Sequence, residues 1–138
     1  MLARHQRISQ RSDFSRTLRH GVRVRRRDLM TYVLVSPDVW PDSRGVRVDV
    51  AEPAGPRVGL IVSKAVGNAV ARHAVARRLR AASAEALQGV STPSTVVIRA
   101  LPTAADVSET VLAQQVSAAV DRSGLVRTPS ATATGAAL

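Results

Sequence analysis

The chain has 138 residues, a formal net charge of +10 and no cysteine. This length suits one domain with a modest core, and the charge points to a nucleic acid or an anionic membrane surface as partner. The lack of cysteine excludes a disulfide framework, a thiolate nucleophile and a cysteine-based zinc site. No apolar run reaches the roughly 18–20 residues that span a membrane, and no apolar segment follows the charged N-terminus as in a signal peptide. We therefore expect a cytoplasmic protein without membrane association.

The positive charge is concentrated in two blocks. Residues 1–27 contain nine arginines and one aspartate, and residues 64–80 contain five basic residues and no acid. Residues 28–63 and 81–138 each have a small net negative charge. Nineteen of the 20 basic residues are arginine, which binds phosphate through two parallel hydrogen bonds and stacks on bases. This clustering favours RNA as the partner.

The first block predicts a basic arm followed by a short helix. Residues 1–11 show no apolar periodicity, so we expect an extended or mobile arm. A helix is expected over residues 13–19, with Ser12 as its cap and Phe14 and Leu18 as an apolar i, i+4 pair.

Three strands and a long connection follow. Residues 22–36 are rich in strand formers, and the polar tetrad 25–28 divides them into two strands. Residues 36–56 contain four prolines and are interpreted as a hairpin connection. Residues 57–63 are nearly continuously apolar, which predicts a strand at the centre of the sheet.

The C-terminal half predicts two more helices and a fourth strand. A long helix is expected over residues 68–87, and a strand over residues 94–101. The last helix starts at either Thr103 or Ser108 and ends near Asp121.

Together these elements predict one α+β domain over residues 1–122. One antiparallel-leaning sheet with its helices on one face is the most economical packing. Residues 123–138 are mostly Ser, Thr, Ala, Gly and Pro with few large apolar groups, which predicts a disordered tail.

No catalytic constellation is visible in the sequence. The acids are not paired at a useful spacing, no phosphate-binding glycine loop is present, and the three histidines lack the spacing of metal ligands. Ser63 and Lys64 alternate across a strand, which disfavours a Ser–Lys pair. We expect that the protein alone neither cleaves nor transfers anything.

The long helix combines an apolar side with a basic side. The apolar side contains Ala71, Val75, Leu79, Ala82 and Ala86, and the other side contains Arg72, His73, Arg77 and Arg80. A merely solvated helix usually interleaves Glu with Arg, so the absence of acids over residues 64–80 favours contact with nucleic acid. Gly67 at the helix entry fits either a phosphate-binding turn or a plain tight turn.

Residues 64–80, KAVGNAVARHAVARRLR, resemble the signature of the bacterial ribonuclease P protein subunit. That family has a Lys, then Val-Gly-Asn-Ala-Val, then an Arg-Asn-Arg core at the start of its long central helix. The resemblance covers residues 4–121, with further matches at Asp13-Phe14, His20-Gly21, Tyr32 and residues 97–99.

Three positions within the central motif depart from the family pattern, and outside it Leu18 stands where the family often has a second aromatic residue. His73 stands where Asn is usual, Ala74 where Arg is usual, and Ala76 where Lys is common. Two cations are therefore missing from the motif, although the tract stays basic.

The resemblance implies a fold and an activity. The fold is helix-β-β-β-helix-β-helix with a single four-stranded sheet and a left-handed βαβ crossover, ribosomal protein S5 domain 2-like. A monomer of the protein is expected to pair 1:1 with a catalytic RNA, and the complex removes the 5′ leader from precursor tRNA. Mg²⁺ ions serve the cleavage and are held chiefly by RNA. A structural RNA-binding protein of ribosomal type is the alternative, because composition fits both.

The resemblance also implies two sets of contact residues, neither of which is catalytic or metal-binding. The face of the long helix that meets the RNA subunit contains Lys64, Asn68, Arg72, His73, Arg77, Arg78 and Arg80. The cleft between the first helix and the sheet, which holds the leader, is formed by Phe14, Leu18, Tyr32, Arg16 and Arg99. Aromatic stacking and arginine contacts suit a single strand bound without sequence readout.

Overall fold

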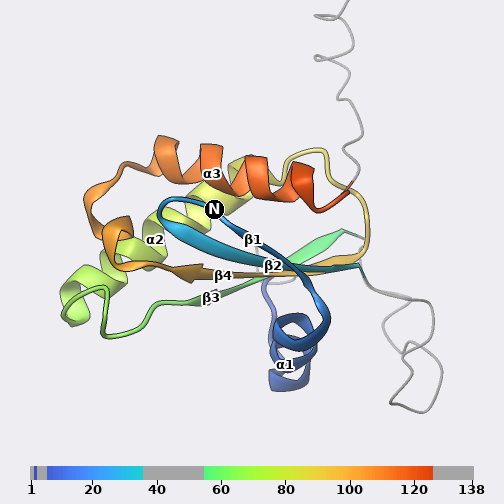
Figure 1. Ribbon diagram of the computed structural model, residues 1–138, viewed down its shortest axis with the longest axis horizontal. Helices are drawn as coiled ribbons and strands as arrows, with labels where there is room; N and C mark the ends of the chain where they lie inside the picture. The colour runs from blue at the N-terminus through green and yellow to red at the C-terminus, as the bar shows by residue number, and fades with distance from the viewer. Residues whose placement is uncertain (1, 3–5, 36–54, 126–138) are drawn as a thin grey trace, which may run out of the picture.

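The computed structural model describes residues 2, 6–35 and 55–125. The predicted order of helices and strands is confirmed (Figure 1). The elements are α1 (Arg11–His20), β1 (Val22–Arg25), β2 (Leu29–Val35), β3 (Pro56–Ile61), α2 (Ala69–Ala86), β4 (Ser94–Ala100), the 3-10 helix η2 (Pro102–Asp106) and α3 (Glu109–Arg122). Almost all of the predicted connection over residues 36–56 lies outside the described residues.

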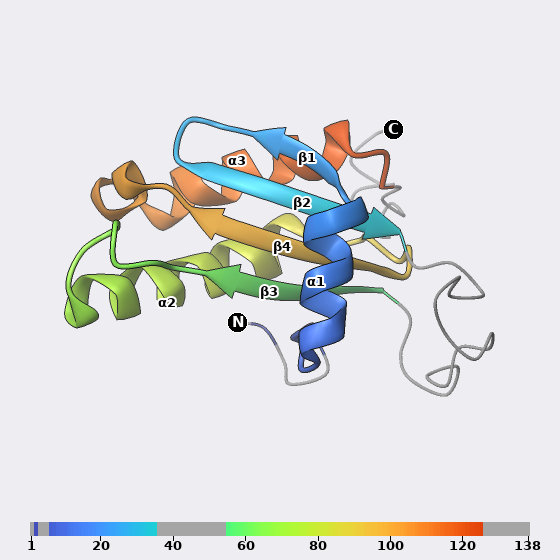
Figure 2. The ribbon, with the colours of Figure 1, turned by 60° about the horizontal axis from the view of Figure 1, so that its bottom comes forward.

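The strands form one mixed sheet in the order β1-β2-β4-β3. β2 is antiparallel to both β1 and β4, whereas β3 is parallel to β4. In Figure 2 the arrows of β3 and β4 both point left, β4 lies above β3, and α2 lies behind the sheet. The connection from β3 through α2 to β4 is therefore left-handed, which is the rare hand for this unit.

The apolar run of residues 57–63 predicts a central strand, and this prediction is wrong. β3 lies at the edge of the four-stranded sheet, and β4 is central. The run is apolar because β3 is covered on three sides. Val58 is buried in the main core, the Phe14 ring lies over Gly59 on the opposite face, and the Ile8 N–H donates to the Val58 carbonyl at 2.9 Å. The described part of the N-terminal arm thus shields the edge of the sheet.

Helices cover both faces of the sheet, not one face as predicted. α2 and α3 pack on one face, and α1 crosses the other (Figures 1 and 2). The main core lies between the sheet and the α2–α3 pair, where the largest buried apolar side chains are Leu29, Leu79, Ile98, Leu112, Val33, Val75, Val96, Val116 and Val120. The smaller cluster on the α1 face consists of Ile8, Tyr32 and Val97, with Phe14, Met30 and Ile61 packed against it. Because one short helix covers that face, part of it stays open.

The helix starts follow cap chemistry in two of three cases. The Asn68 side chain accepts from the Ala71 N–H at 2.9 Å and starts α2, as its residue type indicates. Ser108 caps α3, so the later of the two predicted starts is confirmed. The prediction that Ser12 caps α1 is wrong, because α1 begins earlier, with Gln10 at the cap position and no side-chain bond there.

The packed domain extends past residue 122. The Leu125 side chain is buried, and the Ser123 hydroxyl donates to the Ala119 carbonyl at 2.7 Å. Residues 123–125 therefore belong to the domain, and the rest of the predicted tail lies outside the described residues.

Asp28, in the turn between β1 and β2, is a buried hydrogen-bonding centre. Its carboxylate accepts from Thr103 Oγ1 at 2.5 Å and from Gln115 Nε2 at 2.6 Å, while its own N–H donates to Gln115 Oε1 at 2.9 Å. Burial raises the pKa of Asp28, but the bonds from Thr103 and Gln115 and the charge of Arg27 outweigh it, so the pKa is lowered. Asp28 thereby joins the β1–β2 turn to η2 and α3.

We expect Asp28→Ala to lower the free energy of unfolding by about 2–4 kcal/mol at neutral pH, because two hydrogen bonds to a carboxylate are lost. Asp106→Ala removes an exposed carboxylate of η2 and should change the free energy of unfolding by less than about 0.5 kcal/mol. The lowered pKa means that the contribution of Asp28 is present above the pKa of the unfolded chain and is lost as pH falls through the folded-state pKa. Urea denaturation of the wild-type protein and both variants, from neutral to acid pH, measures this pH-dependent contribution to stability. Equal stability of wild type and Asp28→Ala at pH 7 would contradict the assignment.

Candidate nucleic-acid interface

The outward side of α2 is an exposed basic surface. His73 and Arg77 are exposed, whereas Val75 on the opposite side of the helix is fully buried. Lys64 and Asn68, at the entry to the helix, are also exposed. These four residues form what we call the α2 surface: Lys64, Asn68, His73 and Arg77.

The other predicted residues of the basic helix lie on its flanks. Arg72, Arg78 and Arg80 are half-buried. Arg78 Nη2 donates to the Ala105 carbonyl at 3.0 Å and so ties α2 to η2. Arg80 lies on the opposite flank, where it lines a cavity together with Phe14. The structure thus places Arg78 as an anchor of the fold and Arg80 near the predicted leader cleft.

Gly67 forms a tight turn at the start of α2. Its φ is +154°, a conformation that disfavours side chains, and a Cβ at this position would lie 2.9 Å from the Cβ of Ala71. Its N–H donates to the Lys64 carbonyl at 3.2 Å, so this donor is used within the turn. The geometry favours the plain-turn interpretation over a phosphate site.

On the α1 face of the sheet, the strand register arranges the side chains in three rows. The row beneath α1 contains Leu34, Thr95 and Arg57. The middle row contains Arg23, Tyr32, Val97 and Gly59. The outermost row contains Arg25, Met30, Arg99 and Ile61. Figure 2 shows α1 crossing one end of the sheet and leaving the end with the β3 and β4 arrowheads uncovered.

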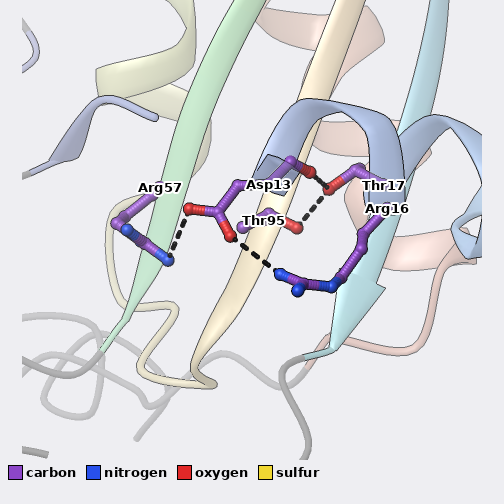
Figure 3. Close-up of polar contacts among 5 residues, drawn as sticks. All are labelled: Asp13, Arg16, Thr17, Arg57 and Thr95. Carbon is purple, nitrogen blue, oxygen red and sulfur yellow. Dashed lines mark hydrogen bonds and ion pairs between the residues drawn. The ribbon is translucent and has the colours of Figure 1, made fainter. Parts of the chain in front are cut away.

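Polar contacts with Thr95 and Arg57 hold α1 against the sheet (Figure 3). Asp13 is buried, and its carboxylate lies 3.6 Å from Arg16 Nη1 and 3.4 Å from Arg57 Nη2. The Thr17 hydroxyl donates to the Asp13 carbonyl at 2.7 Å and accepts from the Thr95 hydroxyl. Arg16, predicted to contact the leader, is therefore paired with a carboxylate. Sequence reasoning missed Arg57, although its alternation with Val58 along the strand could have placed it on this face.

The predicted leader residues come together but differ in accessibility. Phe14 is half-buried over Gly59, and both it and Tyr32 belong to the small cluster on this face. Tyr32 is only 9% exposed, whereas Leu18 on the outer side of α1 is 37% exposed. Arg99 is exposed on the uncovered end of the sheet. An incoming ligand therefore meets Phe14, Leu18 and Arg99 before it meets Tyr32.

A cavity of about 190 Å³ lies beside Phe14 at the edge of β3. Arg7 of the N-terminal segment and Arg80 of α2 line it, together with Leu2, Ile8, Val58, Gly59 and Leu60. Two cations from distant parts of the chain thus meet between the α1 face and α2.

Two absences hold for the part of the chain that the structure describes. No group of three or more His, Asp or Glu side chains could hold a metal ion there. No helix in residues 6–35 or 55–125 is long and apolar enough to cross a membrane.

Comparison with known proteins agrees with the motif. The profile of the family described as Ribonuclease P matches residues 2–124. The chain belongs to the ribonuclease P protein family. Ribonuclease P protein components are 44% identical over 135 residues in Nocardia farcinica, covering 91% of this chain and 85% of that one, and 44% identical over 126 residues in Rhodococcus erythropolis, covering 91% and 94%.

Solved structures of this family share the fold. The Staphylococcus aureus RNase P protein superposes with a TM-score of 0.66 at 21% identity, covering 87% of this chain and 96% of that one. The Thermotoga maritima protein, in complex with a thiourea compound, superposes with a TM-score of 0.64 at 13% identity, covering 84% and 98%. The arrangement of elements therefore persists at low sequence identity.

We expect Gly59→Ala to displace Phe14 from the sheet, because the added methyl group would overlap the ring. The free energy of unfolding should fall by about 1–3 kcal/mol, as for other overpacked sites. Phe14→Ala removes the ring that the methyl group meets, so the double variant should be destabilised by less than the sum of the single variants. Urea denaturation of the four proteins measures this coupling. Strictly additive effects would show that the two residues do not touch.

Proposed function

We propose that this protein is the protein subunit of ribonuclease P and that it binds the catalytic RNA and the 5′ leader of precursor tRNA. The observation that carries the proposal is the family match over residues 2–124, which includes the basic motif on α2. The protein supplies binding surfaces, and the endonucleolytic chemistry belongs to the RNA. Mg²⁺ for the cleavage is held chiefly by RNA phosphates.

The α2 surface is assigned to the RNA subunit. His73 and Arg77 project from a helix that carries no acid before Glu85, so an RNA backbone meets positive charge without repulsion along most of the helix. Phosphate contacts of this kind dominate affinity and make it depend on salt. Arg72 borders the same surface and contributes from its half-buried position.

The α1 face of the sheet is assigned to the leader. Phe14 and Leu18 offer accessible apolar area for bases, and Arg99 offers a guanidinium for phosphate. Such a combination binds a single strand with little sequence preference, because every base has a face for stacking. Tyr32 supports this floor from its buried position, and Arg16 flanks it.

We further assign a monomer in a 1:1 complex with the RNA and a cytoplasmic location, where precursor tRNA is processed in bacteria. A structural RNA-binding protein of ribosomal type would share the basic helix and the fold. The family match over most of the chain favours ribonuclease P over that alternative.

Reconstitution with a bacterial ribonuclease P RNA tests the function. At limiting Mg²⁺, the purified protein should raise the rate of precursor tRNA cleavage above that of the RNA alone. A ribosomal protein of similar net charge is the matched control, because it screens repulsion between RNAs without the specific surfaces. Enhancement no greater than that of the control would contradict the proposal.

The two neighbouring arginines of α2 should behave differently when changed. Arg77→Ala should weaken binding to the RNA subunit and reduce the slope of log K against log salt by about one unit or less, because one phosphate contact is lost. Arg78→Ala should instead lower the free energy of unfolding by about 1 kcal/mol, because the bond to the Ala105 carbonyl is lost. RNA binding at several salt concentrations and urea denaturation separate the two effects. An unchanged salt slope for Arg77→Ala would remove the α2 surface from the interface.

A further inference from the structure

β1 adds two arginines to the α1 face of the sheet. Arg23 is paired in register with Tyr32, and Arg25 with Met30, and both arginines are exposed. Val24 between them is buried on the opposite face. Because successive side chains of a strand point to opposite faces, turning the arginines away would expose Val24. The packing of β1 therefore fixes both cations on the open face.

The charge on this part of the face is not compensated by the acids that the structure describes. Asp13 lies at the other end of the sheet, where it pairs with Arg16 and Arg57. Asp28 lies in the adjacent turn, but its carboxylate is used by Thr103 and Gln115. Neither Arg23 nor Arg25 forms an ion pair within residues 6–35 and 55–125. The open end is thus a one-signed surface.

On this part of the face, arginine side chains stand on either side of less polar side chains. In the outermost row, Met30 lies between Arg25 and Arg99. Because adjacent strands are about 4.8 Å apart, the backbone positions of these two arginines are about 10 Å apart. Along β1, Arg23 and Arg25 are about 7 Å apart. Met30 and the Tyr32 ring form the floor that these cations border. Bases can lie on such a floor while phosphates meet the arginines, which suits a single strand and not a duplex.

We propose that Arg23 and Arg25 bind phosphates of a single-stranded RNA segment that crosses the open end of the sheet to its β1 edge. Resting on the proposed function, this segment is a stretch of the leader other than the nucleotides beside Phe14. The protein then gains affinity from leader nucleotides beyond those that α1 can reach. Arg99 belongs to the same path, between the α1 end and the β1 edge.

The test compares the holoenzyme containing wild-type protein with one containing Arg23→Ala/Arg25→Ala. Dissociation constants are measured for precursor tRNAs with a leader of about two nucleotides and of about ten nucleotides, which bracket a short and a full site. The double variant should bind the long-leader substrate about 5- to 20-fold more weakly and the short-leader substrate within about twofold of wild type. Arg23→Lys/Arg25→Lys keeps the charge and should recover most of the lost affinity.

Arg122→Ala is the matched control, because this exposed arginine ends α3 on the other side of the sheet. It should leave both dissociation constants unchanged. An equal loss on both leaders, no loss on either, or the same loss in Arg122→Ala would overturn the proposal. Failure of the proposed function looks different, because the wild-type protein would then improve neither binding nor cleavage of any precursor. Unfolding curves of β1 variants should match wild type, since both side chains are exposed.

Discussion

The α1 face of the sheet, which we propose binds the leader, depends on a buried carboxylate that holds α1 in place. The helix has few apolar residues, and Asp13 lies beneath it with little access to water. An unpaired buried carboxylate would be costly, so its position requires the guanidinium groups of Arg16 and Arg57. The Thr17–Thr95 bond pins the same turn of the helix. Because these contacts all lie in one row of the sheet, α1 is fixed at one end and the other end remains open for a ligand.

The connection from β3 to α2 begins at the open end of the sheet, so the two surfaces that we propose bind RNA lie near the same end of the molecule (Figure 2). β3 ends at Ile61, in the outermost row of the open face, and the chain then turns through Gly67 into α2 on the opposite face. Lys64 and Asn68, which belong to the α2 surface, lie in this passage. Arg80 and Arg7 meet at the β3 edge, where a cavity again lies between the two faces. The residues that we propose contact the precursor tRNA and those that we propose contact the catalytic RNA are therefore different residues of one small domain.

Local chemistry was predictable from the sequence, whereas long-range pairing was not. The Asn68 cap, the division of residues 22–36 and the start of α3 at Ser108 depend on neighbours within a few positions. The edge position of β3 depends on residues far away in the chain, because Phe14 and Ile8 provide the cover that its apolar pattern requires. The roles of Asp28 and Arg57 depend on partners far along the chain.

The predictions of site residues were limited in the same way, because residue type is local and packing is not. Arg78 and Arg80 are two residues apart and were assigned to one surface, yet two helical positions are about 200° apart, so they lie on opposite flanks. Helical geometry alone would have separated them. Phe14 and Tyr32 were placed together by resemblance, and the structure brings them into one cluster but buries most of Tyr32. Residue type identified the face, and only the packing identified which side chains a ligand can reach.

Exposed arginines lie on both of the surfaces that we propose bind RNA. Ala74 and Ala76 stand where the family pattern has cations, and in this chain both are half-buried on α2. The outward side of the helix presents Arg77 as its exposed arginine within the described part of the chain. The N-terminal block places Arg23 and Arg25 on the α1 face of the sheet through the register of β1. Exposed positive charge is thus present on the sheet as well as on the basic helix.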